Sequence, residues 1–360
     1  MKPSVVLAIN PGSTSTKVAL FRGLEEAWSD TQRYDADRIR EFPSIPAQEK
    51  FRLEEIRKAL RKKGTEATDF DAVVGRGGLL RPIPGGTYKV STEMLEDLRS
   101  CRFGSHASNL GGPLAKRIAD EAGGVPAFIV DPVVVDELID EVRLSGIPEI
   151  ERRSVFHALN QKAVARRASS ELGKDFDKAN LIVAHMGGGI SVGVHRGGRV
   201  IDVNNALDGE GPFTPERAGS LPAGEMVKFV FSTGIKLEEL MRKMVGGGGL
   251  VAHLGTNDLR EVEEMTAGGD EKARLVFEAM AYQVAREICC RAAVLSGEVD
   301  AVVLTGGLAF SEAFVGAVSR RVAFIAPILV FPGEDEMRAL AEGALRVMSG
   351  QEAAQEYERA

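Results

Sequence analysis

The feature that most constrains this chain is one pattern that occurs twice, about half a chain apart. Residues 5–21 form an apolar segment, a turn of small polar residues and an alternating segment, and residues 181–194 repeat that order. An apolar strand, a short turn and an alternating strand are typical of a β-hairpin. So large an offset favours duplication of a domain over a solenoid, which needs short repeats. Chance recurrence of a common strand–glycine–strand pattern is the alternative.

Helical and strand-like segments alternate in both halves. Apolar residues at helical spacing, each run followed by glycine, predict helices at 51–63, 113–122, 154–172 and 270–296. Short apolar runs predict strands at 72–74, 127–130 and 301–304. The alternation indicates an α/β protein with mixed sheets. A boundary between two domains is expected near residues 142–152, where Gly146 and Pro148 interrupt a polar stretch.

Charge and apolar runs exclude several classes of function. The chain has 45 Lys+Arg against 52 Asp+Glu, a formal charge of −7, and no basic block, so neither nucleic acid nor a membrane is expected as a partner. The longest apolar run, residues 322–331, is far shorter than the ~20 residues that span a bilayer. Three cysteines are too few for a disulfide framework. A cytoplasmic location is therefore expected.

The Ser/Thr-rich turn after the first strand is the strongest local motif. The chain lacks a Walker P-loop, a dinucleotide-binding glycine pattern, an H-E-x-x-H helix, zinc-ligand spacing and a G-x-S-x-G elbow. Asn10-Pro-Gly-Ser-Thr-Ser-Thr-Lys17 instead carries four consecutive hydroxyl residues and a lysine. Such a turn can surround a phosphoryl group with neutral donors and one cation. A plain Ser/Thr hairpin is the alternative.

This turn resembles that of the acetate and butyrate kinases of the actin/sugar-kinase/Hsp70 superfamily. Further matches follow in family order, so that the resemblance covers roughly residues 4–345. They are Val74-Gly-Arg-Gly-Gly78, His106-Ala-Ser-Asn-Leu110, Phe156-His-Ala-Leu-Asn160, Ala184-His-Met-Gly-Gly-Gly189, Thr214-Pro-Glu-Arg-Ala-Gly219, Gly255-Thr-Asn-Asp258 and Leu304-Thr-Gly-Gly307.

The resemblance implies duplicated actin-like (ribonuclease H-like) domains, with mixed sheets flanked by helices and a central cleft. The first domain would contain residues 1–145 and a returning C-terminal helix in 334–360, and the second residues 146–333. The Asp131–Glu137 segment resembles the butyrate-type branch, because acetate kinases have Asp-Thr-Ala-Phe-His there. Gln161 stands where acetate kinases place a second histidine, so the role of that histidine cannot be transferred.

The implied activity is reversible, ATP- and Mg²⁺-dependent phosphorylation of a short-chain carboxylate to an acyl phosphate. Butyrate, isobutyrate or another branched acid is the expected substrate, and a homodimer or higher homo-oligomer the expected assembly. One alternative is an acetate or propionate kinase on the same fold. Another is an actin-like or chaperone-like ATPase that uses nucleotide to change shape, and a third is an inactive nucleotide-binding scaffold.

By the resemblance, site residues come from both halves of the chain. Arg76 and Arg217 would match phosphoryl and carboxylate charge, because forked guanidinium groups bind such oxygens in pairs. The implied catalytic residues are Arg76, Asp131, His185 and Arg217; the phosphate-binding ones Asn10, Ser13, Ser15, Lys17, Gly187, Gly188 and Gly189; the nucleotide-binding ones Asp258, Gly306 and Gly307; and the acyl-site ones Arg76, His106 and Asn109. Asn10 and Glu336 would belong to the metal site, with Glu334 as the alternative glutamate.

Overall fold

Two β-hairpins begin the two sheets of this protein. The structure, a computed structural model, describes residues 3–207 and 209–358. These residues form two compact units: unit 1 runs up to Val135 and resumes at Asp335, and unit 2 is Asp136–Glu334. The division into acetokinase-type domains at residues 145 and 334 stays a prediction beside these structural bounds.

Both units follow the same plan of strands and helices. Unit 1 contains β1 (Val5–Pro11), β2 (Ser15–Arg22), β3 (Glu25–Arg33), α1 (Ala36–Arg40), α2 (Glu49–Lys62), β4 (Ala72–Arg76), β5 (Thr87–Lys89), α3 (Thr92–Ser100), the short 3-10 helix η3 (Ala107–Leu110), α4 (Gly111–Glu121), β6 (Ala127–Val130) and α13 (Glu336–Met348). Unit 2 contains α5 (Asp140–Arg143), α6 (Ala158–Glu171), β7 (Leu181–Met186), β8 (Ile190–Arg196), β9 (Arg199–Val203), α7 (Ala223–Thr233), α8 (Leu237–Met244), α9 (Gly249–Leu254), α10 (Leu259–Ala267), α11 (Glu271–Val294), β10 (Ala301–Gly306), the 3-10 helix η5 (Gly307–Phe310), α12 (Glu312–Val322) and β11 (Ile328–Pro332).

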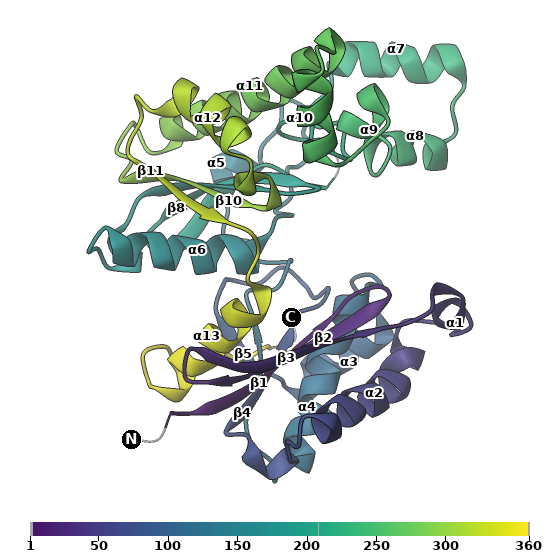
Figure 1. Cartoon of the computed structure of the whole chain (residues 1–360), viewed down its shortest axis with the longest axis vertical. Coiled ribbons are helices and arrows are strands. Elements are labelled where there is room, and N and C mark those ends of the chain that lie inside the picture. Colours follow the sequence, from purple (N-terminus) through teal and green to yellow (C-terminus); the bar gives the residue numbers. More distant parts are fainter. Residues whose placement is uncertain (1–2, 208, 359–360) are drawn as a thin grey trace. The chain divides into compact units, whose positions relative to one another are not determined.

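The two sheets repeat one strand order. Figure 1 labels β1 to β5 in unit 1, and β8, β10 and β11 in unit 2. Unit 1 has the order β3-β2-β1-β4-β6-β5, and unit 2 has β9-β8-β7-β10-β11 when taken from the same edge. In unit 1, the antiparallel strands β3, β2 and β1 are followed by β4 and β6, which run parallel to β1. In unit 2, the antiparallel strands β9, β8 and β7 are followed by β10 and β11, which run parallel to β7. The edge strand β5 is an addition, antiparallel to β6. The predicted duplication and the α/β class are therefore confirmed.

Helices cover both faces of the unit 1 sheet. Leu7 and Ile9 of β1 pack in one apolar cluster with residues of α2, α3 and α4. Successive strand residues point to opposite faces, so the alternate positions need a second cover. The returning helix α13 supplies it, since it contacts β1, β4 and β6 and Gly343 lies against Val130. A strand buried on both faces favours the continuous apolar runs that the sequence shows.

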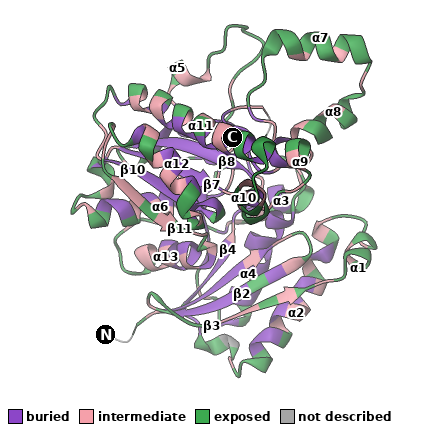
Figure 2. Ribbon diagram, turned by 45° about the horizontal axis from the view of Figure 1, so that its top comes forward, coloured by how far each residue is buried: buried purple, intermediate pink, exposed green. Residues whose placement is uncertain are grey.

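The unit 2 sheet is covered in the same way. Ile182 and Ala184 pack with α11 and α12, whereas Leu181 and Val183 pack with α6. The helix α6 therefore takes in unit 2 the place that α13 takes in unit 1. Figure 2 shows the buried strands in purple, and α7 and α8 in green and pink. Every described residue of α7 and α8 is at least partly exposed.

None of the helices in the described part of the chain has the length and apolarity needed to cross a membrane.

Candidate functional site

One buried arginine holds the turn between β1 and β2. The guanidinium of Arg52, on α2, donates to the backbone carbonyls of Gly12 (2.7 Å), Ser13 (2.9 Å) and Ser15 (2.8 Å). Arg52 is fully buried, and this burial lowers the pKa of its guanidinium below the ordinary value. Ser13 and Lys17 stay exposed, and Ser15 is half-buried. The predicted phosphate-binding turn therefore has a fixed backbone with polar side chains on its outer side.

Asn10, Arg76 and Glu336 meet in what we call the amino-terminal cluster. Asn10 lies near the end of β1 and Arg76 ends the neighbouring parallel strand β4. Glu336 begins α13 and accepts hydrogen bonds from Asn10 Nδ2 (2.6 Å) and Arg76 Nη1 (2.5 Å). The structure thus brings together three predicted site residues, and it shows that the Arg76 guanidinium can hold a carboxylate.

Two glycines let the helix α4 begin directly against β4. A Cβ at Gly75 would lie 2.1 Å from the carbonyl oxygen of Gly111, and a Cβ at Gly111 would lie 2.0 Å from that of Arg76. Neither contact is possible for a real side chain, so both positions need glycine. This close approach places Arg76 beside the start of α4.

His106 and Asn109 lie just before that helix. His106 caps η3 and its Nδ1 accepts from the Ser108 amide at 3.2 Å. Partial burial, and after it the positive charge of Arg76, lower the pKa of His106 below its ordinary value. The buried amide of Asn109 accepts from Leu79 N and donates to Gly104 O. The His106 side chain is therefore still exposed to solvent near Arg76. Asn109, in contrast, is buried and links the loops that contain Leu79 and Gly104.

Asp131 follows β6 in a left-handed backbone conformation, with φ +38°. It is buried, and its Oδ1 accepts from the backbone amide of Gly86 at 2.7 Å. Its own amide donates to the Gly86 carbonyl. In this structure Asp131 fixes the turn that leads into β5.

The turn between β7 and β8 carries a second cluster, the glycine-turn cluster, made of the predicted residues Gly187–Gly189 and Arg217 together with Thr214. Thr214 Oγ1 donates to the Gly188 carbonyl and accepts from the Arg217 amide. The Arg217 guanidinium donates to the Ala206 carbonyl and lies against Gly189, where a Cβ would be 2.3 Å from Nη1. Glycine at this turn therefore makes room for the arginine.

His185 lies one residue before this turn and is completely buried. Its Nε2 is 3.0 Å from Glu334 Oε1, and its ring stacks on that of His157 with the centroids 4.2 Å apart. Within the described chain, His185 Nδ1 has no hydrogen-bond partner. Because a buried N–H without an acceptor is costly, the proton of neutral His185 belongs on Nε2.

A cavity of about 620 Å³ opens beside the glycine turn. Its walls include Gly187 and Gly188, Asp258 at the start of α10, and Gly307 at the start of η5. It therefore unites predicted phosphate-binding and nucleotide-binding positions within unit 2.

Asp258 and Phe310 line that cavity, and Gly306 directly precedes its wall at Gly307. Gly306 has φ +90°, and a Cβ there would meet the Met186 carbonyl at 2.4 Å, so β10 can end close to β7 only with glycine. The Asp258 side chain accepts from Arg260, which lowers the pKa of Asp258. Phe310 is 72% exposed at the rim and offers an aromatic face to a ligand.

Glu336 and Glu334, the two alternative glutamates for the metal site, belong to different units. Glu334 pairs with His185 in unit 2, whereas Glu336 pairs with Asn10 and Arg76 in unit 1. No three His, Cys, Asp or Glu side chains among the described residues gather as a metal cage. Mg²⁺ binds one or two carboxylates and keeps several waters, so Glu336 and the Asn10 amide form a suitable donor set.

The butyrate-type segment Asp131–Glu137 also belongs partly to unit 1 and partly to unit 2. Asp131 belongs to unit 1, and Glu137, in unit 2, forms a buried ion pair with Lys162 of α6 at 2.9 Å. Glu137 also accepts from the Val200 amide of β9. In this structure the segment's last residue therefore ties α6 to the sheet.

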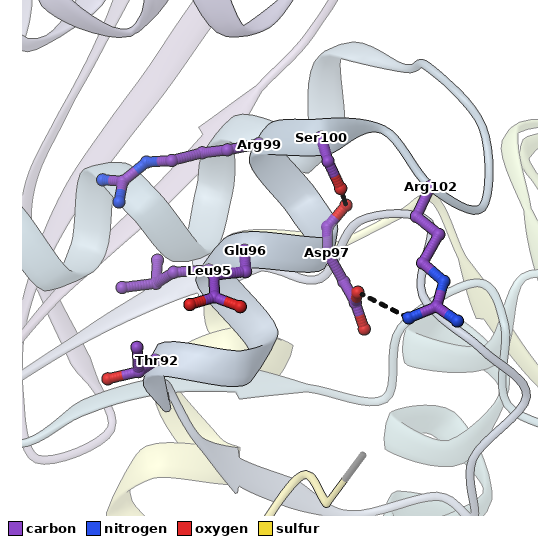
Figure 3. A pocket seen from close by; sticks show the side chains of 7 residues that line it. All are labelled: Thr92, Leu95, Glu96, Asp97, Arg99, Ser100 and Arg102. Carbon is purple, nitrogen blue, oxygen red and sulfur yellow. Dashed lines mark hydrogen bonds and ion pairs between the residues drawn. The ribbon is translucent and has the colours of Figure 1, made fainter. Parts of the chain in front are cut away.

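A larger depression of about 690 Å³ lies on α3 and carries none of the predicted site residues. Figure 3 shows its polar side chains, with Asp97 paired to Arg102 and its carbonyl bonded to Ser100. Asp97 also accepts from Tyr357 near the C-terminus. Asp97 and Arg99, two charged side chains of this depression, therefore already have partners, the latter in Glu49.

Sequence reasoning missed Arg52, Thr214 and Phe310 as contributors. Arg52 falls on the apolar-periodic helix α2, and no local pattern separates it from the other arginines there. Thr214 is part of the Thr214–Gly219 motif, but the motif by itself gives the threonine no separate role. Phe310 follows the Thr305-Gly306-Gly307 turn, and that position was the only available signal.

Several known proteins are similar to this chain in sequence or in fold. The family model described as "Acetokinase family" matches residues 148–326. "Butyrate kinase 2" of Clostridium acetobutylicum is 53% identical over 352 residues, which are 98% of this chain and 99% of that protein. "Probable butyrate kinase" of Coprothermobacter proteolyticus is 54% identical over 353 residues, with the same shares of each chain. The Porphyromonas gingivalis acetate kinase structure has a TM-score of 0.78 at 21% identity, covering 96% of this chain and 100% of that chain, and shares the fold.

Proposed function

The chain belongs to the acetokinase family, and from this we propose that it is a butyrate kinase, which transfers the γ-phosphoryl group of ATP reversibly to butyrate or a related short-chain carboxylate. The observation that carries the proposal is identity above 50% to butyrate kinases over nearly the whole chain. A cytoplasmic location stays part of the proposal.

Phosphoryl transfer to a carboxylate requires groups that neutralise negative charge, and it does not require a strong base. A carboxylate is ionised near pH 7 and is already a nucleophile. Negative charge on the phosphoryl oxygens must be met by positioned donors. Arg76 would receive the substrate carboxylate, since in the structure it already binds that of Glu336. Arg217, at the glycine turn, would match phosphoryl charge.

The nucleotide would bind in the cavity of unit 2. Its backbone-lined wall at Gly187 and Gly188 suits phosphates, and the exposed Phe310 suits the base. Glu336 with Asn10 would hold Mg²⁺. When bound, Mg²⁺ would neutralise charge on the nucleotide phosphates.

A hydroxamate-trap assay with ATP, Mg²⁺ and carboxylates from acetate to branched five-carbon acids tests the proposal. Butyrate or isobutyrate should yield more acyl phosphate than acetate, because each buried methylene contributes about 0.8 kcal/mol and two give roughly a tenfold preference. Equal or better use of acetate would favour an acetate kinase. Nucleotide hydrolysis without hydroxamate would favour a conformational ATPase.

Variants of the two arginines test the assigned roles. Arg76→Ala and Arg217→Ala should each lower turnover by about 10²-fold, as removal of a charge-stabilising donor does. Arg196→Ala removes an exposed arginine at the end of β8 and serves as the control. Near-normal turnover in either site variant would remove that arginine from the mechanism.

We also propose that the chain forms a homodimer or higher homo-oligomer through α7 and α8. Apolar residues gather there, and Phe231 is 85% exposed. The first turn of the helix α8 contains Glu238 and Glu239, and its last turn contains Arg242 and Lys243. An antiparallel second copy would therefore place opposite charges against each other, which favours a copy of this chain as the occupant.

A further inference from the structure

The helix α6 begins with a hydrogen-bond relay that reaches the histidine pair. His157 immediately precedes α6, and Gln161 lies one turn further along. Ser191, on β8, is the cross-strand partner of His185. Gln161 and Ser191 are completely buried, whereas His157 is half-buried.

The orientation of the Gln161 amide follows from its partners. Its Nε2 donates to the Ser191 carbonyl (3.0 Å) and to Ser191 Oγ (2.8 Å). A carbonyl oxygen can only accept, so the NH₂ group must face Ser191. The amide oxygen then faces His195 Nε2 at 3.1 Å, which must carry a proton.

The Ser191 hydroxyl lies between Gln161 and His157, so the orientation of the amide decides the direction of the next hydrogen bond. Among the described residues, Ser191 Oγ contacts only Gln161 Nε2 and His157 Nδ1, the latter at 3.0 Å. The amide uses one acceptor position of the hydroxyl, and the hydroxyl proton is left to donate to Nδ1. A buried hydroxyl proton without an acceptor would be costly, so Nδ1 accepts and neutral His157 carries its proton on Nε2.

We propose that Gln161 is a positioning residue that, through the Ser191 hydroxyl, fixes neutral His157 as the Nε2–H tautomer in the stack with His185. The consequence is a donor N–H at one defined edge of the His157 ring, next to the strand that leads into the glycine turn. A fixed donor is what developing negative charge requires. Its connection to catalysis rests on the proposed function, whereas the tautomer does not.

Two substitutions reverse or remove the relay without altering its shape. Gln161→Glu has the same size. Because one of its oxygens faces the Ser191 carbonyl, the buried carboxyl keeps a proton that donates to this carbonyl. The same oxygen can accept the Ser191 hydroxyl proton, and Ser191 Oγ can then accept from His157 Nδ1–H. Ser191→Ala deletes the donor to Nδ1. Ser169→Ala is the control, because Ser169 is also buried on α6 and its hydroxyl bonds only to the Ala165 carbonyl in the described structure.

Nitrogen NMR of the full-length protein with ¹⁵N-labelled histidine measures the tautomer directly. The wild type and Ser169→Ala should show His157 as Nε2–H, whereas Gln161→Glu and Ser191→Ala should show Nδ1–H or a mixture. Turnover in the hydroxamate assay should fall about 10- to 100-fold in these two variants, with the KM for ATP nearly unchanged. Ser191→Thr keeps the hydroxyl and should retain the wild-type tautomer and most turnover.

Three results would overturn the proposal. The first is Nδ1–H at His157 in the wild type, and the second is an unchanged tautomer in Ser191→Ala. The third is a changed tautomer with wild-type turnover, which would show that the His157 tautomer does not matter for catalysis. If the wild type makes no acyl phosphate, the proposed function fails, and the NMR comparison still decides whether Gln161 sets the tautomer.

Discussion

Arg52 shows how a residue outside every motif can shape a candidate site. It is fully buried, yet its guanidinium meets three backbone carbonyls of the first turn and the Gln48 side chain. Its planar fork can reach several acceptors at once, which the single ammonium of lysine cannot do.

Arg52→Lys should therefore loosen the turn while keeping the positive charge. Carbonyls left without donors should cost about 1–3 kcal/mol in the free energy of unfolding, measured by urea denaturation. Phosphoryl transfer should fall as well, because Ser13 and Ser15 lose their fixed backbone. Arg57→Lys, on the same helix, changes a surface ion pair with Glu121 and should cost little. Equal effects of the two substitutions would contradict this role of Arg52.

His195 gives the fold a dependence on pH. Burial, and after it the charges of Lys162 and Arg166, lower the pKa of His195 to about 3 from 6.5. The unfolded chain binds this proton below pH 6.5, but the folded chain does not until about pH 3. The stability that neutral His195 contributes is thus present above pH 6.5 and lost as the pH falls toward 3.

From pH 7 to pH 5, this histidine should account for a loss of roughly 2 kcal/mol in the free energy of unfolding. His195→Gln removes the titrating group and should flatten the pH dependence by that amount. His253→Gln replaces an exposed histidine on α9 and serves as the control. Urea denaturation at pH 7, 6 and 5 provides the measurement, and identical slopes for the wild type and His195→Gln would refute it.

At the scale of elements, glycines serve two different purposes, at the end of β4 and in the turn after β7. Gly75 lets the backbone of α4 touch β4, because an added Cβ would collide with the Gly111 carbonyl. Gly189 instead makes room for the end of the Arg217 side chain. Backbone cannot yield cheaply, whereas the end of a flexible side chain can.

Gly75→Ala should therefore cost stability, by about 1–3 kcal/mol as overpacking does. Gly189→Ala should leave the free energy of unfolding nearly unchanged but displace Arg217, and so lower turnover roughly tenfold or more. Denaturation and the hydroxamate assay on both variants separate the two purposes. Loss of stability in Gly189→Ala with normal turnover would reverse the assignment.

For the whole molecule, the α7–α8 surface predicts self-association. Phe231→Glu or Leu237→Glu, at residues 85% and 68% exposed, should convert the assembly to monomers in light scattering coupled to size-exclusion chromatography. A stable interface buries about 1,200 Å² or more, and a charge at its centre is not tolerated. Phe324→Glu changes a residue that is 80% exposed outside α7 and α8, and should leave the assembly intact. A monomeric wild type would contradict the proposal.

The amino-acid sequence by itself determined the elements of this protein and their duplication. Alternation in the hairpins at residues 5–21 and 181–194, and helical spacing in α2, α4, α6 and α11, are encoded within short windows of chain. Glycine marked the turns and close approaches. These signals are local, so periodicity and turn chemistry were enough to obtain the fold class.

Only the tertiary structure decided which side chains meet. Glu336 bonds Asn10 across 326 residues, and Arg52 reaches the first turn across about 40, whereas Glu334 turns to His185. After Gly350, the described residues form no helix, and Gln355 instead forms a β-bridge with Tyr88. Such partners depend on how strands and helices pack over long separations, and no window of sequence records that packing.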